Sequence, residues 1–250
     1  MGLRPPPNCV WSACGQSPLH NQAGFNTLSD WLIAYSLRLI AEAKPLYSES
    51  DYAYGTKANQ FLMEQKHRLE PGMKTLVVGD GEGRNGVWLA LQGLDVLSVD
   101  LSPVGLRKAE ALADRDRVKI KTLCADLTSW QWSQATYDLV VAIYVHFDPK
   151  VRQRMHRSML KALKPGGLLI LEAFNPKQLQ YQTKYNSGGP KISEMLYQPE
   201  MLQTDFAGGK ILELTETITE LREGEYHWGK ASVIRLVLQR FDDGTMKKQQ

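Results

Sequence analysis

The sequence lacks several features that would place it in common classes of protein. No apolar run approaches the roughly 20 residues that a membrane-spanning helix needs. The first residues, MGLRPPPNCVWSACG, lack the apolar core of a secretory signal peptide. The formal net charge is only +3, which is too small to indicate a nucleic-acid partner. We therefore expect a cytoplasmic protein with no membrane partner, and nucleic acid is disfavoured as a partner.

Cysteine is also scarce, with only 3 residues in the chain. Cys9 and Cys14 lie in a proline-rich stretch with only His20 near them, which is too few ligands for a metal site. Cys124 lies in an apolar run, where a cysteine is most simply a small buried hydrophobic residue. We therefore expect no metal centre, and this use of cysteine fits the cytoplasm.

A glycine-rich turn stands between an apolar run and a helical pattern. Residues 75–90 read TLVVGDGEGRNGVWLA, with Gly79, Gly81 and Gly83 in the turn. Such a turn lets the backbone approach a nucleotide-like ligand at a helix N-terminus. Asp100 ends the next apolar run, 21 residues after Gly79. An acidic residue there is placed to accept hydrogen bonds from both hydroxyls of a ribose.

Strand-like and helix-like patterns alternate through the middle of the chain. The predicted strands are residues 75–78, 95–99, 118–123, 137–144 and 168–174, and the predicted helices between them are 84–93, 103–115 and 149–163. Residues 210–221 and 230–241 then alternate as two long strands joined by REGEYHWG, which is typical of an antiparallel hairpin. We predict an α/β fold: a doubly wound, mostly parallel, seven-stranded sheet with this hairpin at one edge.

The length of 250 residues suits one well-buried domain. Residues 1–28, rich in proline and polar side chains, are interpreted as a flexible tail. The single domain is predicted over residues 29–241, beginning with a helix at 29–45 that follows an N-cap signal. Residues 175–209 are predicted as a polar insertion on the substrate side.

The glycine turn alone fits two classes of ligand. A dinucleotide needs G-x-G-x-x-G, which Gly81, Gly83 and Gly86 satisfy. S-adenosylmethionine has no phosphate, and the turn would run alongside its methionine part. Three later features favour the second ligand: the acid in Cys124-Ala125-Asp126-Leu127 after the third strand, the Pro-Gly-Gly turn before the fifth strand, and the antiparallel hairpin.

At this point the sequence resembles the class I S-adenosylmethionine-dependent methyltransferases. The matching segments are VVGDGEGRNGVWLA, VDLS, ADL, YDLVVAIYVHF and LKPGGLLILEAF, in the order and spacing of the family, over roughly residues 47–240. The motif GEGRN, with the segment YAYGTKANQFL before it, is most similar to the small-molecule branch that includes tellurite-resistance-type methyltransferases. One departure is Val77, which stands where the family usually has an acid.

The resemblance implies S-adenosylmethionine as the cofactor and a Rossmann-like methyltransferase fold. It also implies cofactor contacts from the glycine turn, the following helix start, and the ends of the second, third and fourth strands. The predicted cofactor-binding residues are Gly79, Asp80, Gly81, Gly83, Arg84, Asn85, Asp100, Leu101, Asp126, Leu127, Ala142 and Ile143. Asp80, together with Glu82, is expected to contact the cofactor's amino group in place of the acid missing at Val77. Arg84 and Asn85 are expected to reach the cofactor's carboxylate.

The reaction implied is in-line transfer of a methyl group to a small-molecule acceptor. A base is needed only where the acceptor must lose a proton, and His146 and Tyr144, after the fourth strand, are the candidate catalytic residues. His146 also fits a turn and helix cap. The acceptor pocket is expected to use Tyr52, Tyr54, Tyr181, Tyr185, His227 and Trp228.

Other functions remain open at this stage. A methyltransferase acting on RNA or protein would use the basic helix at 149–164 to meet the polymer. A nicotinamide-dependent oxidoreductase would need a Tyr-x-x-x-Lys pair, and the spacings from Tyr54 to Lys57 and from Tyr181 to Lys184 are each one residue short of it. A cofactor-binding module without catalysis is disfavoured by the intact Gly79, Asp100 and Asp126. The sequence does not name the acceptor or the oligomeric state.

Overall fold

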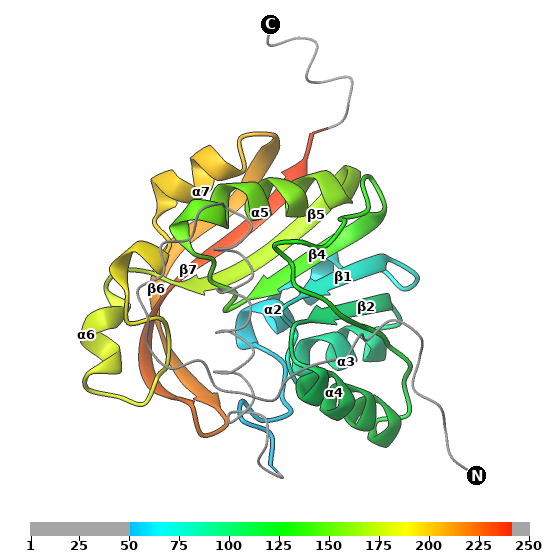
Figure 1. Cartoon of the computed structure of the whole chain (residues 1–250), viewed down its shortest axis with the longest axis horizontal. Coiled ribbons are helices and arrows are strands. Elements are labelled where there is room, and N and C mark those ends of the chain that lie inside the picture. The colour runs from blue at the N-terminus through cyan, green and yellow to red at the C-terminus, as the bar shows by residue number, and fades with distance from the viewer. Residues whose placement is uncertain (1–50, 242–250) are drawn as a thin grey trace, which may run out of the picture.

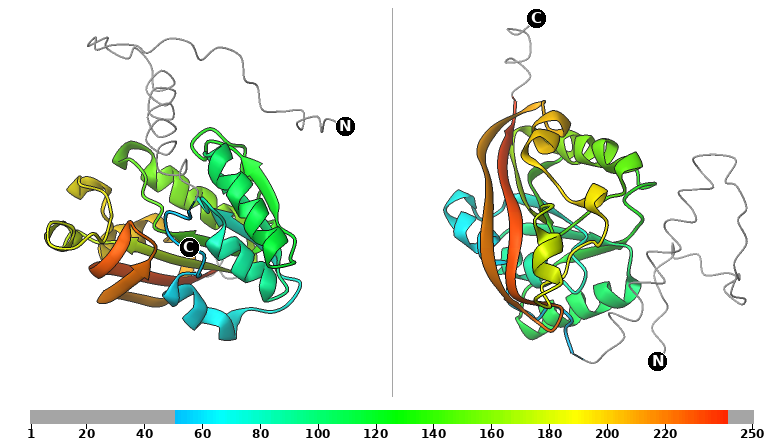
Figure 2. Two further views of the ribbon diagram at one scale, coloured as in Figure 1. Left: turned by 90° about the horizontal axis from the view of Figure 1, so that it is seen from below. Right: turned by 90° about the vertical axis from the view of Figure 1, so that its left-hand side faces the viewer.

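The computed structural model describes residues 51–241 of the chain. The predicted tail at 1–28, the predicted helix at 29–45 and the last nine residues lie outside this range. Figures 1 and 2 show one α/β unit in which a twisted sheet carries helices on both faces. Within the described residues, no helix is long and apolar enough to cross a membrane.

Seven strands form one sheet in the order β3-β2-β1-β4-β5-β7-β6. The strands are β1 (Lys74–Val78), β2 (Asp95–Asp100), β3 (Lys121–Cys124), β4 (Tyr137–Ile143), β5 (Leu163–Phe174), β6 (Gly209–Glu223) and β7 (His227–Arg240). Strands β1 to β5 pair in parallel, while β7 pairs antiparallel with both β5 and β6. The predicted sheet, including its antiparallel edge, is confirmed.

The helices are placed by local capping signals and by their apolar faces. They are α2 (Gln60–Glu64), α3 (Arg84–Leu91), α4 (Pro103–Arg115), α5 (Pro149–Ala162), α6 (Gln178–Gln182) and α7 (Pro199–Asp205), with short 3₁₀ turns η1 (Gln65–Arg68) and η2 (Ser193–Met195). Ser102 caps α4 by accepting from Gly105 N, and Asp148 caps α5 by accepting from Lys150 N. In both helices proline occupies the first turn, where no N–H is needed.

The core has a layer on each face of the sheet. On one face, Phe61 of α2 and Leu89 of α3 pack against Val77, Val141 and Ile170. On the other face, residues of α5 and α7, among them Met155, Met159 and Leu202, pack against alternate residues of the same strands. Burial on both faces explains why these strands read as continuous apolar runs.

The order of strands reverses between β1 and β4, because β1 leads outward to β2 and β4 leads the other way to β5. In open parallel sheets a crevice for ligands forms outside the carboxyl ends of the strands at such a point. The loops that follow β1 and β4 therefore meet at one position, and this position brings the glycine turn opposite residues 144–147.

Three local predictions were wrong. The predicted turn at 164–167 is part of β5, which already pairs with β4 at Leu163 and then changes register. Gly167 permits this, because a Cβ there would lie 2.9 Å from Lys164 O. The turn of the hairpin is shorter than predicted, so His227 and Trp228 lie in β7. Cys124 is exposed rather than buried, since it ends the outermost strand β3.

Candidate functional site

The glycine turn between β1 and α3 has a backbone that only glycine adopts easily. The φ angles of Gly79, Gly81 and Gly83 are +62°, +56° and +85°, in the left-handed region that costs other residues roughly 1–2 kcal/mol. At Gly83 a Cβ would also lie 2.7 Å from the Cα of Ala109 in α4. The third glycine therefore lets α3 and α4 pack closely, and the first two shape the turn.

Asp100, at the end of β2, fixes this turn. One of its carboxylate oxygens accepts from Gly81 N at 2.8 Å, and the other accepts from Ser102 N at 2.8 Å. A carboxylate offers about four lone-pair sites, so with these bonds and a further one from the Leu101 backbone N–H it can still accept a hydrogen bond from a ligand. Burial raises the pKa of Asp100 despite these bonds from backbone N–H groups.

Two acids in the turn are held by protein groups. Asp80 Oδ2 accepts from the Ser98 hydroxyl at 2.6 Å and Oδ1 from Gly86 N at 3.3 Å. Burial raises the pKa of Asp80 to about 7. The Glu82 carboxylate pairs with Lys108 Nζ at 2.6 Å and accepts from Ala53 N at 2.8 Å. Glu82 thus ties the chain before β1 to the turn.

A cavity of about 720 Å³ opens at the carboxyl edge of β1 and β4. One side is formed by the glycine turn and the start of α3, and the other by aromatic residues and by the loop that precedes η2. The lining residues are Tyr54, Gly55, Gly79, Asp80, Gly81, Glu82, Arg84, Asn85, Ile143, Tyr144, His146, Phe174, Gly189, Pro190, Lys191, Ile192, Met195 and His227. The cavity therefore has one polar side and one aromatic side.

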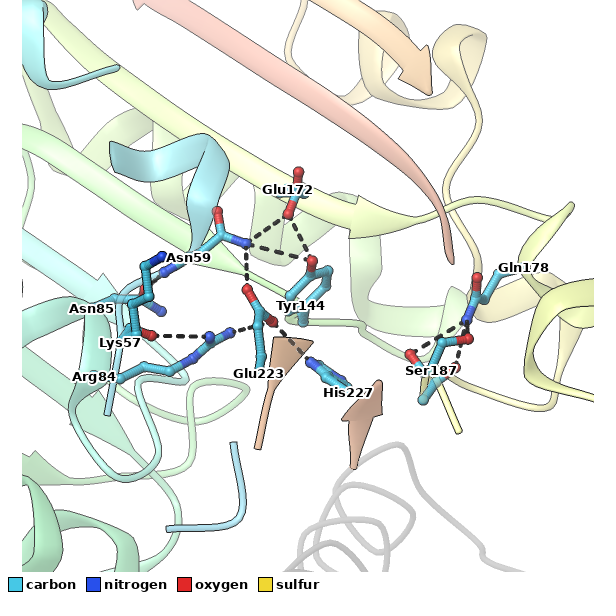
Figure 3. Close-up of polar contacts among 11 residues, drawn as sticks. Lys57, Asn59, Arg84, Asn85, Tyr144, Glu172, Gln178, Ser187, Glu223 and His227 are labelled. Carbon is cyan, nitrogen blue, oxygen red and sulfur yellow. Dashed lines mark hydrogen bonds and ion pairs between the residues drawn. The ribbon is translucent and has the colours of Figure 1, made fainter. Parts of the chain in front are cut away.

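Behind the aromatic side lies a buried polar network, drawn in Figure 3. The amide nitrogen of Asn59 donates to Glu172 Oε1 at 2.7 Å and to Glu223 Oε1 at 3.3 Å. The hydroxyl of Tyr144 donates to the same oxygen of Glu172 at 2.7 Å. Arg235 Nε pairs with the other Glu172 oxygen at 2.6 Å. This cationic partner and the two donors balance the buried charge of Glu172.

Glu223 links the β6–β7 hairpin to the start of α3. Its Oε2 lies 2.9 Å from Arg84 Nη2 and 3.2 Å from His227 Nδ1. Burial alone would raise the pKa of Glu223, but the bond with His227 and the charge of Arg84 outweigh burial and lower it to about 2. Glu223 is therefore ionised at neutral pH. Burial lowers the pKa of His227, against the effect of Glu223.

Tyr144 follows β4 in an unusual backbone conformation, with φ of +57°. A left-handed conformation at a bulky residue is strained and needs support from its surroundings. The support comes from Glu172 at the hydroxyl and from Phe174, whose ring stacks on that of Tyr144 with centroids 4.6 Å apart. Burial, with the charge of Glu172, raises the pKa of Tyr144 well above its usual range.

His146 is held by backbone groups at both ring nitrogens. Nδ1 lies 2.8 Å from Met195 O, which can only accept, and Nε2 lies 3.2 Å from Phe174 N, which can only donate. The ring is thus fixed as the neutral Nδ1–H form, with its one lone pair engaged. Burial lowers the pKa of His146 to about 4. This geometry argues against the prediction that His146 acts as a general base.

The structure brings together part of the predicted site. Of the predicted cofactor residues, Gly79, Asp80, Gly81, Arg84, Asn85 and Ile143 line the cavity, as do both candidate catalytic residues. Asp100 does not line the cavity itself but accepts a hydrogen bond from Gly81 N, which does. Gly83, Leu101, Asp126, Leu127 and Ala142 lie outside the cavity lining. Asp126 accepts from Thr128 N at 2.8 Å in the loop after β3. The role of each of these residues stays a prediction.

Only two of the six aromatic residues predicted for the acceptor pocket line the cavity. They are Tyr54 and His227, whose rings lie 4.4 Å apart. Tyr52 instead donates to Lys108 O, and Tyr181 stacks on Tyr185. Trp228 is 58% exposed. Its side chain points away because neighbouring residues of a strand alternate between the two faces.

Sequence reasoning missed Asn59, Glu172, Glu223 and Arg235. One signal was available: Glu172 in LLILEAF and Arg235 in VIRLVL are single charges within apolar strands. A buried charge needs a partner, and the two residues are directly opposite each other in the β5–β7 register. Asn59 and Glu223 gave no such signal. Within residues 51–241, no cluster of His, Cys, Asp and Glu is suited to hold a metal ion.

Comparison with known proteins agrees with this architecture. A family model described as "Methyltransferase domain" matches residues 76–167, which run from β1 to the beginning of β5. Residues 76–167 are a class I S-adenosylmethionine-dependent methyltransferase domain. S-adenosylmethionine is accordingly the cofactor. The residues present fit it, since Asp100 retains acceptor lone pairs beside an open glycine turn and an adjoining cavity.

The individual relatives of the methyltransferase domain are distant. Sterol methyltransferase-like 3 from Botryococcus braunii is 24% identical over 57% of this chain and 40% of its own length. The structure from work on the conversion of a disulfide bond into a thioacetal group in echinomycin biosynthesis has a TM-score of 0.67 at 16% identity, covering 85% of this chain and 95% of that one. TehB from Haemophilus influenzae has a TM-score of 0.60 at 18% identity, covering 73% and 62%.

These likenesses to solved structures show the fold of the methyltransferase domain. The chain spans only 37–50% of the length of the first four curated relatives that it matches. The activity and the acceptor of the whole chain are therefore matters for proposal.

Proposed function

We propose that this chain transfers the methyl group of S-adenosylmethionine to a small-molecule acceptor bound in the 720 Å³ cavity. The observation that carries the proposal is the junction of the glycine turn with this cavity: Asp100 holds Gly81 at one end, and Tyr54, Tyr144 and Phe174 form a wall at the other. A cofactor lying along the turn would direct its reactive end toward the aromatic wall.

Three groups of residues would hold the cofactor. The backbone of Gly79 and Gly81 gives the methionine part and ribose a close approach without side chains. Asp100 accepts from the ribose hydroxyls with the lone pairs that Gly81 and Ser102 leave open. Arg84 and Asn85 line the cavity at the start of α3, where the helix N-terminus favours the cofactor's carboxylate. Arg84 itself is paired with Glu223, and its guanidinium adds positive charge near that carboxylate.

When bound, the cofactor supplies an activated methyl group on a positively charged sulfur. The protein then has to align the acceptor with that group and keep water out. Stacked Tyr144 and Phe174 provide a rigid apolar surface next to Ile143 for this alignment. The two predicted bases do not take a proton in this scheme: His146 has both nitrogens engaged, and Tyr144 donates to Glu172.

Two features favour a small acceptor over RNA or protein. The cavity is bounded by the loop from Gly189 to Ile192 and by Met195, which limits the room for a polymer. The basic helix α5, the predicted contact for a polymer, uses Arg152 to pair with Asp205 and Arg154 to donate to Thr128 O. These two cations are therefore committed to internal bonds.

Calorimetry with S-adenosylhomocysteine and, separately, with NAD tests the proposal. We expect S-adenosylhomocysteine to bind and NAD not to bind. Asp100→Ala should weaken S-adenosylhomocysteine binding by about 1.5–3 kcal/mol, the range for losing hydrogen bonds to a charged group. Asp95→Ala, at the exposed start of the same strand, is the matched control and should leave the affinity unchanged. Binding of NAD alone would refute the proposal.

A further inference from the structure

His227, the first residue of β7, has a ring whose two nitrogens are in different surroundings. Nδ1 lies 3.2 Å from Glu223 Oε2, and Figure 3 shows the ring turned with this nitrogen toward Glu223. An ionised carboxylate can only accept a hydrogen bond, so Nδ1 carries the hydrogen. Arg84 and Asn59 hold Glu223 from its other sides. The orientation of the His227 ring is thus fixed by a carboxylate that is itself fixed.

The second nitrogen, Nε2, is then the unprotonated one of the neutral ring. Within the described part of the chain, the structure gives the His227 ring one hydrogen-bond partner, Glu223, at Nδ1. The Nε2 edge of the ring faces Gly188, where a Cβ would lie 2.8 Å from Nε2. His227 lines the cavity together with Tyr54, Tyr144 and Phe174. His227 is therefore part of the cavity wall, with its Nε2 edge on the side where Gly188 lies.

His146 offers an instructive contrast in the same cavity. Its Nδ1 is held by Met195 O in a similar way, but its Nε2 already accepts from Phe174 N. A base needs a lone pair within reach of the proton that it takes. Of these two histidines, only His227 combines an anionic partner at Nδ1 with an unengaged Nε2 among the described residues.

We propose that His227, oriented by Glu223, is the general base of this methyltransferase, and that the acceptor is a weakly acidic thiol that must lose a proton. The inference rests on the proposed function. Carboxylate, imidazole and acceptor then form a chain in which the carboxylate sets the tautomer and stabilises the imidazolium that forms, as in other carboxylate–histidine pairs.

The sulfur of the acceptor attacks the methyl carbon while His227 Nε2 takes the acceptor's proton. A new bond joins the acceptor to the methyl group, and the bond between methyl and the cofactor's sulfur breaks, leaving its electron pair on that sulfur. His227 is left as an imidazolium beside Glu223, and the proton passes to solvent as product leaves. No oxidant, reductant or metal is required.

Nitrogen-15 NMR of the histidine rings in the full-length protein tests the base without any acceptor. At pH 7.5 we expect the His227 ring to be neutral, protonated at Nδ1 and unprotonated at Nε2. His227→Gln assigns the signal, and His67→Gln, at an exposed position, is the matched control for assignment. Glu223→Gln should lower the pKa of His227, because the imidazolium loses its anionic partner. A ring protonated at Nε2 would overturn the proposal.

Kinetics with two probe thiols test the role in transfer. Phenylmethanethiol is protonated at pH 7.5 and needs a base, whereas 4-nitrothiophenol is already a thiolate. His227→Gln should reduce kcat for phenylmethanethiol by about 100-fold or more, the low end for a general base. The same variant should lower kcat for 4-nitrothiophenol by less than about threefold. Equal losses for both thiols would indicate a merely structural role and overturn the proposal.

The two proposals fail separately. If S-adenosylhomocysteine does not bind, the proposed function is wrong, whatever the tautomer of His227. If S-adenosylhomocysteine binds but neither thiol is methylated, the assignment of a thiol acceptor is wrong. If it binds and His227→Gln leaves kcat for phenylmethanethiol unchanged, His227 is not the base. Unchanged S-adenosylhomocysteine affinity in His227→Gln shows that the variant is folded.

Discussion

The carboxyl group of Asp80 is buried inside the protein rather than exposed at the surface. It is 7% exposed, and its partners are the Ser98 hydroxyl and Gly86 N, neither of them a cation. A raised pKa means that the folded state prefers the protonated form. The folded protein therefore binds one proton more than the unfolded chain at pH values between about 4 and the folded pKa of about 7.

The buried, protonated Asp80 should contribute its full stabilisation to the free energy of unfolding below about pH 4. This stabilisation should be lost as the pH rises to 7. Asp80→Asn cannot ionise and can keep both hydrogen bonds, so its stability relative to the wild type should increase between pH 4 and pH 8. The increase should be up to about 4 kcal/mol, from about three pKa units at 1.36 kcal/mol each. Urea unfolding at both pH values measures it, and a constant difference would contradict the account.

Much of the site was predicted from local patterns of residues. The glycine turn, Asp100 and the start of α3 were predicted because each depends on a few neighbouring positions and on the period of the strand. Cys124 was misjudged because the apolar run around it did not reveal that β3 is the outermost strand. Glu223 was missed because its partner Arg84 is 139 positions away in the sequence, and no local pattern encodes such a pair.

At the scale of elements, the packing of α3 against α4 depends on the absence of a side chain at Gly83. A Cβ at this position would overlap Ala109 of α4, in addition to the left-handed backbone at φ of +85°. Gly72 has nearly the same φ, +86°, but nothing lies within 4 Å of the place a Cβ would take. The two glycines therefore separate the conformational cost from the packing cost.

Gly83→Ala should destabilise the protein more than Gly72→Ala does. For Gly72→Ala we expect a loss of about 1–2 kcal/mol from the left-handed backbone alone. Gly83→Ala should add about 1–3 kcal/mol, since α3 and α4 must move apart. It should also weaken binding of S-adenosylhomocysteine, which Gly72→Ala should not. Urea unfolding measures the loss of stability and calorimetry measures the loss of binding. Equal losses of stability for Gly83→Ala and Gly72→Ala would show that α4 can move away from α3 at no cost in free energy.

Elements were predicted best where the alternation of burial was strong. The parallel strands and the helices between them followed the predicted order because continuous apolar runs and capping residues mark them. The first part of β5 was missed, because Lys164-Pro165-Gly166-Gly167 has the composition of a turn. Pairing of Leu163 with Tyr137 draws this segment into the sheet, and this contact depends on the tertiary fold rather than on local preference.

At the scale of the whole molecule, Arg235 joins parts that are distant in the sequence. It pairs with Glu172 of β5 and Glu64 of α2, and its guanidinium lies 4.9 Å from the centre of the Phe61 ring. Glu172 is 1% exposed. Removing its cationic partner would leave a buried carboxylate with only the donors Tyr144 and Asn59.

Arg235→Met should therefore destabilise the folded protein by about 3–5 kcal/mol, the range for breaking a buried ion pair. Adding Glu172→Gln should restore part of this loss, because a neutral amide can remain buried without a cation. Lys121→Met is the matched control: its pair with Asp95 is exposed, and its loss should be within about 1 kcal/mol. Urea unfolding of the three variants measures these values, and equal losses for Arg235→Met and Lys121→Met would refute the account.

The strand order has a consequence for the time at which the site is completed during synthesis. The glycine turn and Asp100 emerge from the ribosome before any residue of the hairpin, and the hydrogen bond between Gly81 and Asp100 involves no residue of the hairpin. Glu223 and His227 come more than 120 residues after Asp100, so the cofactor end of the cavity precedes its opposite wall. A nascent chain that has reached β5 therefore contains the residues of the cofactor turn but not yet the groups that we propose for proton transfer. Proton transfer by His227 would then require that the last strand has been synthesised.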